Sequence, residues 1–148
     1  MRLSTKGQYA LEAMVALAVA GPGVSLSIRE IAGRTGVSQA YLEQIFSNLR
    51  RDGLLESVRG TQGGYLLARA ADSITVSDVL ESGEGSLAPV HCAESGQPVC
   101  DEYETCMTRA LWDDMSKTIR TVTDHLTLAD IVSAWQENGL DDQPDFSI

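Results

Sequence analysis

The sequence lacks any apolar run of the roughly 18–20 residues that a membrane-spanning helix needs. Its most apolar stretch, Tyr9–Gly21, is too short for a span. That stretch also lacks the charged start and the cleavage site of a secretory signal. We therefore expect a cytoplasmic protein with no membrane partner.

Cysteine is scarce, and the three cysteines all lie between His91 and Trp112. An odd count disfavours a closed disulfide framework, and clustered cysteines in the cytoplasm more often bind metal or act in redox chemistry. No CxxC pair is present, which counts against a zinc ribbon or a thioredoxin-type dithiol. No nucleophile–base arrangement is recognisable either, so we expect no enzymatic activity.

Basic residues are scarce in the second half of the chain. The net charge is −10. Residues 1–70 carry eight Lys/Arg and five Asp/Glu, a net of +3, whereas residues 71–148 carry three and sixteen, a net of −13. Only the first half can therefore approach a phosphate backbone.

Apolar periodicity and capping residues predict a helical chain interrupted by one hairpin. Ser27 and Glu30 form a capping box, and Gly36 is a left-handed helix end. The third helix carries an apolar stripe of Leu42, Ile45, Phe46 and Leu49. The predicted elements are a helix from Tyr9 that ends at Gly21–Gly23, helices Ser27–Gly36 and Ser38–Gly53, strands Leu54–Val58 and Tyr65–Ala68 around the tip Arg59–Gly64, a helix near Thr75–Ser82, an irregular loop Gly83–Thr105, a long helix, and a last helix Thr127–Trp135.

This order of elements is that of a winged helix-turn-helix, so the expected fold class is mainly α with a small β-hairpin wing. In that arrangement the third helix enters the major groove of double-stranded DNA. Gln39, Glu43 and Gln44 suit base edges, Arg59 suits a narrow minor groove, and two arginines at the helix end suit phosphates. A solvated Gln/Glu face is the plainer alternative. The predicted DNA-binding residues are Ser38, Gln39, Ala40, Tyr41, Glu43, Gln44, Arg50, Arg51, Arg59, Gly60 and Gln62.

The long helix after the cysteines has no counterpart in a minimal winged domain. Its apolar stripe must be buried, either on the first helix of the same chain or on the matching helix of a second protomer. Two-fold symmetric operators favour dimeric readers, so we expect an antiparallel dimerisation helix and a homodimer. The stripe consists of Leu111, Met115, Ile119, Val122 and Leu126.

The expected domain organisation follows from these elements. Residues 1–82 form the winged helix-turn-helix domain, and residues 83–105 form a cysteine-rich loop that binds a cluster. Residues 106–135 form the dimerisation helix and a C-terminal helix, and residues 136–148 form an acidic flexible tail.

The spacing Cys92-x7-Cys100-x5-Cys106 suits an iron–sulfur cluster, because a loop can wrap around a cluster without regular spacing. Three thiolates leave one ligand unassigned. A zinc site and three ordinary free thiols are the alternatives. The candidates for the fourth ligand are His91, Asp101, Glu102, Glu104, Arg109, and Gln8 or Glu12 from a partner protomer.

Four stretches resemble the IscR-like family of iron–sulfur transcription regulators, which also includes NsrR and RirA. They are "MRLSTKGQYALEAM", "VSQAYLEQIFSNLRRDGLL", "SVRGTQGGYLLAR" and "CMTRALWDDMS", and the resemblance covers roughly residues 1–135. It implies a homodimeric winged-helix regulator with a cluster on Cys92, Cys100 and Cys106. A 2Fe–2S cluster is favoured, with 4Fe–4S as the alternative.

The chain departs from that family around the cluster. Seven residues separate Cys92 from Cys100, where IscR has five, and Arg109 stands where the family has its fourth ligand, a histidine. Arginine stays protonated and is a poor ligand. Glu12 and Glu104 are therefore the candidates that we carry forward. Ala40 also replaces a serine of the recognition helix, which affects sequence preference.

The predicted function is a regulator whose cluster senses iron–sulfur status, iron, oxidative stress or nitrosative stress. One alternative is a winged-helix regulator that uses its cysteines as redox thiols or a zinc site. An alternative of another class is a small electron-transfer or cluster-carrier protein, which would not need the wing.

Overall fold

The computed structural model describes residues 2–94 and 100–138. It is mainly helical with one antiparallel hairpin, which confirms the predicted fold class. The elements are α1 (Thr5–Ala20), α2 (Ile28–Thr35), α3 (Gln39–Arg51), β1 (Leu55–Val58), β2 (Gly64–Leu67), the short 3-10 helix η1 (Ala71–Ser73), α4 (Val76–Glu84), the 3-10 helix η2 (His91–Ala93), α5 (Arg109–His125) and α6 (Leu128–Glu137). Residues 139–148, most of the predicted acidic tail, lie outside the described residues.

Local capping explains where the helices begin. Ser27 Oγ accepts from the N–H of Glu30 at 3.2 Å, and the Glu30 carboxylate accepts from the N–H of Ser27 at 2.7 Å, as the sequence predicts. Ser38 caps α3 by accepting from the N–H of Tyr41. Gly36 between these helices has a φ of 71°, a left-handed conformation that suits glycine. The tight turn sets α3 across α2.

The two strands differ by one residue from the predicted hairpin. Gly64 pairs with Val58 at the end of the ladder, so it belongs to β2 rather than to the tip. Leu54 donates its N–H to the carbonyl of Leu49 at 2.9 Å and closes the end of α3, so β1 begins at Leu55.

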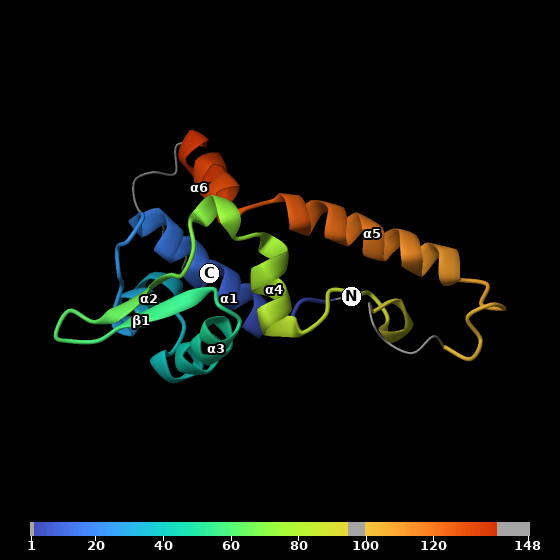
Figure 1. Cartoon of the computed structure of the whole chain (residues 1–148), viewed down its shortest axis with the longest axis horizontal. Coiled ribbons are helices and arrows are strands. Elements are labelled where there is room, and N and C mark those ends of the chain that lie inside the picture. Colours follow the sequence, from blue (N-terminus) through green and yellow to red (C-terminus); the bar gives the residue numbers. More distant parts are fainter. Residues whose placement is uncertain (1, 95–99, 139–148) are drawn as a thin grey trace.

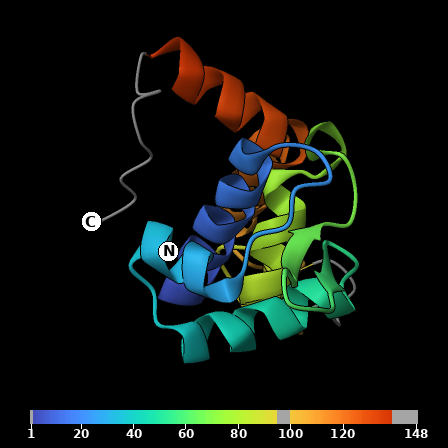
Figure 2. The same ribbon diagram turned by 90° about the vertical axis from the view of Figure 1, so that its left-hand side faces the viewer.

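The core is built around α1, which contacts helices α2, α3, α4 and α6 as well as β2 (Figure 2). Ala10, Ala13 and Ala16 are buried along it, and their small side chains let neighbouring elements approach closely. The stripe predicted on α3 is buried in this core. Leu128 of α6 is fully buried in the same cluster, so the C-terminal helix completes the core of the N-terminal segment.

The base of the hairpin is fixed to the body. Leu26 exchanges two backbone hydrogen bonds with Tyr65, at 2.8 and 2.9 Å, and the Tyr65 ring packs edge-on to Phe46 at 4.7 Å. A Cβ on Gly64 would overlap the carbonyl of Leu26, so only glycine allows this approach. The tip of the hairpin projects from the body beyond these contacts (Figure 1).

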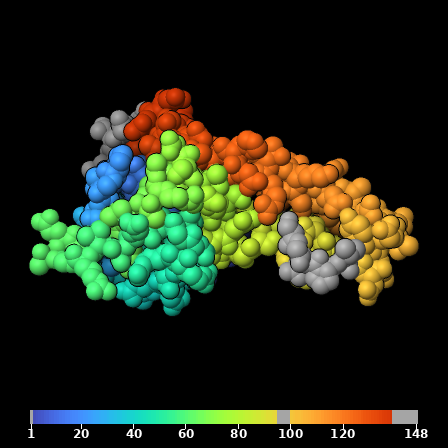
Figure 3. Space-filling model, viewed as in Figure 1, coloured from blue at the N-terminus to red at the C-terminus, as the bar shows by residue number. Residues whose placement is uncertain are grey.

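Helix α5 extends away from the body, and none of its residues is buried (Figure 1). The molecule is therefore elongated, with the hairpin at one end and the cysteine segment at the other (Figure 3). Within residues 2–94 and 100–138, no helix combines the length and the apolar content that a bilayer span requires.

Candidate DNA-binding surface and cysteine site

Helix α3 separates its side chains cleanly into two faces. The stripe from Leu42 to Leu49 is buried, which turns the polar residues outward. The amides and the carboxylate of this exposed face lie in the first half of α3, and its two guanidinium groups lie at the end of the helix. The exposed residues of this face are Ser38, Gln39, Ala40, Glu43, Gln44, Ser47, Arg50 and Arg51.

Tyr41 lies in the first turn of α3 but is half-buried. Its ring packs edge-on to Tyr9 of α1 at 5.9 Å, and its hydroxyl is 3.4 Å from Oγ1 of Thr5. The side chain therefore joins α3 to the start of α1. Its predicted role in DNA binding stays a prediction.

The two arginines at the end of α3 are both exposed. Arg51 Nε donates to Oδ1 of Asp52 at 3.2 Å. Both line a polar hollow between α3 and β1, together with Ser47, Leu55, Glu56 and Ser57. This hollow therefore includes part of the exposed polar face of α3.

The hairpin tip carries the remaining predicted residues. Arg59, Gly60 and Gln62 are exposed, and Arg59 forms no ion pair within the described part of the chain. Gly60 has a φ of 118°, and its carbonyl accepts from the N–H of Gly63 at 3.0 Å. The tip is a tight turn that presents a free cation.

All three cysteines lie around one hollow at the start of α5. Cys92, Cys100 and Cys106 are exposed free thiols that line one small hollow, which Tyr103, Arg109 and Trp112 help to close. Its volume, about 20 Å³, holds roughly one water molecule. Among residues 2–94 and 100–138, no three His, Cys, Asp or Glu side chains stand close enough to hold one metal ion. The three thiols fit a cluster in donor chemistry, but they would have to move closer together, and the hollow would have to widen, to admit one.

Cys106 has a defined environment at the start of α5. A hydrogen bond with the hydroxyl of Thr108, whose oxygen lies 3.5 Å from the sulfur, lowers the pKa of the Cys106 thiol below its usual value. The indole N–H of Trp112 donates to the same hydroxyl oxygen at 3.0 Å. This leaves the hydroxyl hydrogen free to donate to a thiolate, the form that binds metals and reacts with electrophiles.

Arg109 lies in the wall of the hollow. Its guanidinium stacks over the Tyr103 ring at 4.3 Å and donates to the carbonyl of Tyr103 at 3.4 Å. Glu104 and Asp113 each place an oxygen 4.0 Å from it. The residue that replaces the family's histidine therefore supplies positive charge beside the thiols rather than a metal ligand.

The two carboxylates proposed as the fourth ligand lie in different surroundings. The Glu104 side chain is 90 % exposed and faces Arg109. Glu12 lies in α1, where burial raises the pKa of its carboxyl, and its Oε2 has no hydrogen-bond partner among the described residues. His91, the candidate ligand beside Cys92, places its Nδ1 3.3 Å from Oε2 of Glu94.

Residues 3–134 match the model of the Rrf2 family, which is described as an iron-dependent transcriptional regulator. The chain belongs to the Rrf2 family. It is 41% identical over 133 residues to the HTH-type transcriptional regulator IscR of Erwinia tasmaniensis, a match that covers 90% of this chain and 79% of that protein. The IscR of Escherichia coli O1:K1 is 39% identical over 133 residues, and the match covers 90% of this chain and 81% of that protein.

Solved structures of Rrf2 proteins have the same fold. The global cysteine regulator CymR of B. subtilis superposes with a TM-score of 0.76 at 36% identity, covering 90% of this chain and 98% of that one. IscR of T. potens superposes with a TM-score of 0.75 at 36% identity, and the match covers 93% of this chain and 90% of that one. The comparisons confirm the predicted resemblance and show a DNA-binding transcription regulator rather than an enzyme.

Two residues whose contacts the structure shows were not identified from the sequence. Thr108 stands two positions after Cys106, and a hydroxyl so close to a cysteine is a local hint. Glu84 reaches Ser4 across 80 residues, and nothing in one sequence points to that contact.

Proposed function

We propose that this Rrf2 regulator works as a homodimer that reads an operator with α3 and the hairpin tip and carries an iron–sulfur cluster on Cys92, Cys100 and Cys106. The observation that carries the proposal is that all three thiols line one hollow, at the opposite end of the molecule from the exposed residues proposed to read DNA. Such a chain can sense through one end and bind DNA through the other.

The side chains proposed to read DNA match the hydrogen-bonding groups of the bases and the charge of the grooves. Gln39 and Gln44 can pair with adenine, and Glu43 can accept from cytosine N4 while it repels phosphate, so it selects sequence rather than adding bulk affinity. Arg59 on the projecting tip suits the negative potential of a narrow minor groove.

The test of DNA reading uses an operator duplex that the wild-type protein selects from a random-sequence library. Arg59→Ala should weaken binding to this duplex about tenfold or more and reduce the salt dependence of the affinity. Arg69→Ala is a matched control, because Arg69 is exposed after β2 and donates to Ser73 and Asp78 instead. Unchanged affinity and salt slope for Arg59→Ala would reject the wing assignment.

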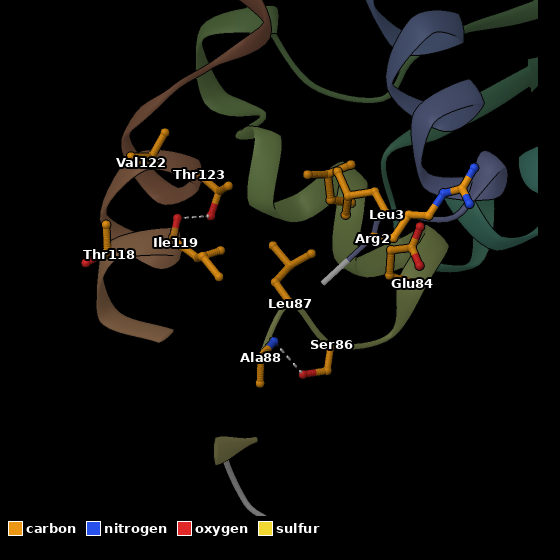
Figure 4. A pocket seen from close by; sticks show the side chains of 11 residues that line it. Arg2, Leu3, Glu84, Ser86, Leu87, Ala88, Thr118, Ile119, Val122 and Thr123 are labelled. Carbon is orange, nitrogen blue, oxygen red and sulfur yellow. Dashed lines mark hydrogen bonds between the residues drawn. The ribbon is translucent and has the colours of Figure 1, made fainter. Parts of the chain in front are cut away.

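Dimerisation is supported by the exposed apolar residues of α5. Leu111 and Val122 are 53% and 59% exposed. Between α5, the end of α4 and the N-terminal residues lies a mainly apolar cavity of about 420 Å³, into which Leu3, Leu87 and Ile119 project (Figure 4). An apolar helix face beside an apolar hollow is buried when two copies associate.

The cluster would be held by the three thiolates, and when bound it supplies a centre that responds to iron, oxidants or nitric oxide. The Cys106 hydrogen bond with Thr108 stabilises one thiolate, and Arg109 offsets the negative charge that gathers there. For the fourth ligand we propose Glu12 of the partner protomer or Glu104 of the same loop. A 2Fe–2S cluster is the expected type, with 4Fe–4S as the alternative.

The test of the cluster is anaerobic purification followed by visible absorption and assays for iron and sulfide. We expect coloured protein with iron and acid-labile sulfide, and loss of both in Cys106→Ser. Colourless protein without iron after anaerobic reconstitution would reject the cluster.

A second candidate is a regulator that uses these cysteines as redox thiols or binds zinc. The exposed Cys106 with its lowered pKa favours it. An oxidised form of the related CymR of Staphylococcus aureus has also been solved, with a TM-score of 0.71 at 33% identity and coverage of 89% and 96%. The same assays separate these functions, because zinc without sulfide, or no metal with reversible thiol oxidation, points to the second.

A further inference from the structure

The last residue of α4, Glu84, places its carboxylate at the start of α1. Its Oε1 accepts from the N–H of Ser4 at 2.9 Å, from the hydroxyl of Ser4 at 2.7 Å and from the N–H of Gly7 at 3.2 Å. The first N–H groups of a helix lack partners within it, and negative charge there is favoured by the helix dipole. One carboxylate therefore holds the start of α1 against the end of α4.

Glycines on both helices allow this close contact. A Cβ on Gly7 would overlap the Glu84 carboxylate, and its three nearest atoms would all belong to the Glu84 side chain. A Cβ on Gly83 would lie 3.0 Å from the Cα of Gly7. The two backbones meet directly, which leaves little freedom between α1 and α4.

The same turn of α1 touches the recognition helix. Oγ1 of Thr5 lies 3.4 Å from the hydroxyl of Tyr41, and the ring of Tyr9 packs edge-on to that of Tyr41. Tyr41 lies between Gln39 and Glu43 in the first turns of α3. The start of α1 is thus held by Glu84 and in turn contacts the base-reading end of α3.

We propose that Glu84 is a positioning residue for DNA binding, because it fixes the start of α1 and, through Tyr41, the first turns of α3. The inference rests on the proposed DNA-reading role of α3. If Glu84 positions α3, removing its carboxylate should change the DNA affinity in the opposite direction from removing a negative charge alone. A carboxylate that merely adds negative charge repels phosphate, so its removal strengthens DNA binding, whereas removal of a positioning carboxylate weakens it.

The first experiment measures affinity for the selected operator duplex with the full chain. Glu84→Ala should bind about three- to tenfold more weakly. Glu84→Gln should lie between, because its amide oxygen still accepts hydrogen bonds. The control is Asp72→Ala, which removes one exposed carboxylate of η1 and should bind equally or slightly more tightly. Affinities are compared at temperatures where melting curves show every variant folded, and unchanged or tighter binding by Glu84→Ala would overturn the proposal.

A double substitution tests the route through Gly7. In the wild-type chain, Gly7→Ala should reproduce the loss of affinity, because its methyl group displaces the Glu84 carboxylate. In the Glu84→Ala chain the same change should have little further effect, since the group it would displace is gone. Additive losses would overturn the proposal.

Amide hydrogen exchange of the free protein separates this inference from the proposed function. Glu84→Ala should speed exchange in the first turns of both α1 and α3, and Asp72→Ala should not. Faster exchange in α1 alone would refute the coupling to α3. Faster exchange in both helices, in a protein that selects no duplex, would reject DNA reading while the structural link stands.

Discussion

At the scale of single residues, the chemistry of the cysteine site depends on the neighbours of each thiol. Beside Cys106, the hydroxyl of Thr108 is held by Trp112 in a position to donate to the sulfur. A hydrogen bond to the thiolate favours the charged form, which lowers the pKa of the thiol. The thiolate of Cys106, the form that binds metals and reacts with electrophiles, is therefore favoured.

Thr108→Val should raise the pKa of Cys106, because it removes the hydroxyl and keeps the shape of the side chain. The thiolate is the nucleophile, so alkylation of Cys106 by iodoacetamide in cluster-free protein should slow about two- to fivefold near pH 7, and the midpoint of its pH profile should move upward. Mass spectrometry of the Cys106 peptide measures both.

Thr105→Val is the matched control for this prediction. The Thr105 hydroxyl donates to the carbonyl of Glu102 rather than to a sulfur, so its loss should leave the alkylation rate unchanged. Equal rates in wild-type protein and Thr108→Val would show that the hydroxyl does not act on Cys106.

At the scale of elements, the DNA-binding role that we propose for the hairpin depends on its fixed base. The backbone pairing between Leu26 and Tyr65 adds a third segment beside β2. Gly64 permits this pairing, since any side chain there would overlap the carbonyl of Leu26. The hairpin is thus a rigid base with an exposed tip.

Gly64→Ala should lower the free energy of unfolding by about 1–3 kcal/mol, the usual cost of forcing atoms into a packed site, and should weaken operator binding. Gly33→Ala is the control, because Gly33 lies inside α2 with no atom within 4 Å of an added Cβ. It should stabilise the protein by about 0.5–1 kcal/mol. Urea unfolding measures both, and a neutral Gly64→Ala would contradict the close docking.

The helices and hairpin of this chain were predictable because their signals are local. Ser27 and Glu30 stand within one turn, and the stripe from Leu42 to Leu49 repeats at helical spacing, so each pattern can be read from neighbouring residues. The strand ends were harder, because Gly64 joins β2 through its pairing with Val58 rather than through its own propensity.

At the scale of the whole molecule, α5 has no complete partner among residues 2–94 and 100–138. Ile119 packs against the small cluster of Val76, Leu80 and Leu87, while Leu111 and Val122 stay exposed. An amphipathic helix that leaves apolar residues in water indicates a further partner, and a second copy of the chain is the partner that we propose.

Val122→Glu should shift the protein from dimer to monomer, because it places a charge in the proposed apolar interface. Sedimentation velocity across a range of concentrations measures the change, which should be at least tenfold in the dissociation constant. Lys117→Glu, on the opposite face of α5, also introduces a glutamate and should leave the dimer intact. A wild-type chain that sediments as a monomer at all concentrations would contradict the dimer.

The sequence by itself determined the winged-helix order, the caps, the outward face of α3 and the location of the cysteines. Each depends on residues within one or two turns of one another, and such spacing is visible in a single chain. Only the tertiary structure decided that Leu128 of α6 completes the core, that Tyr41 turns toward α1, and that Glu84 reaches Ser4. These contacts join segments tens of residues apart, and packing between distant segments leaves no periodic trace in the sequence.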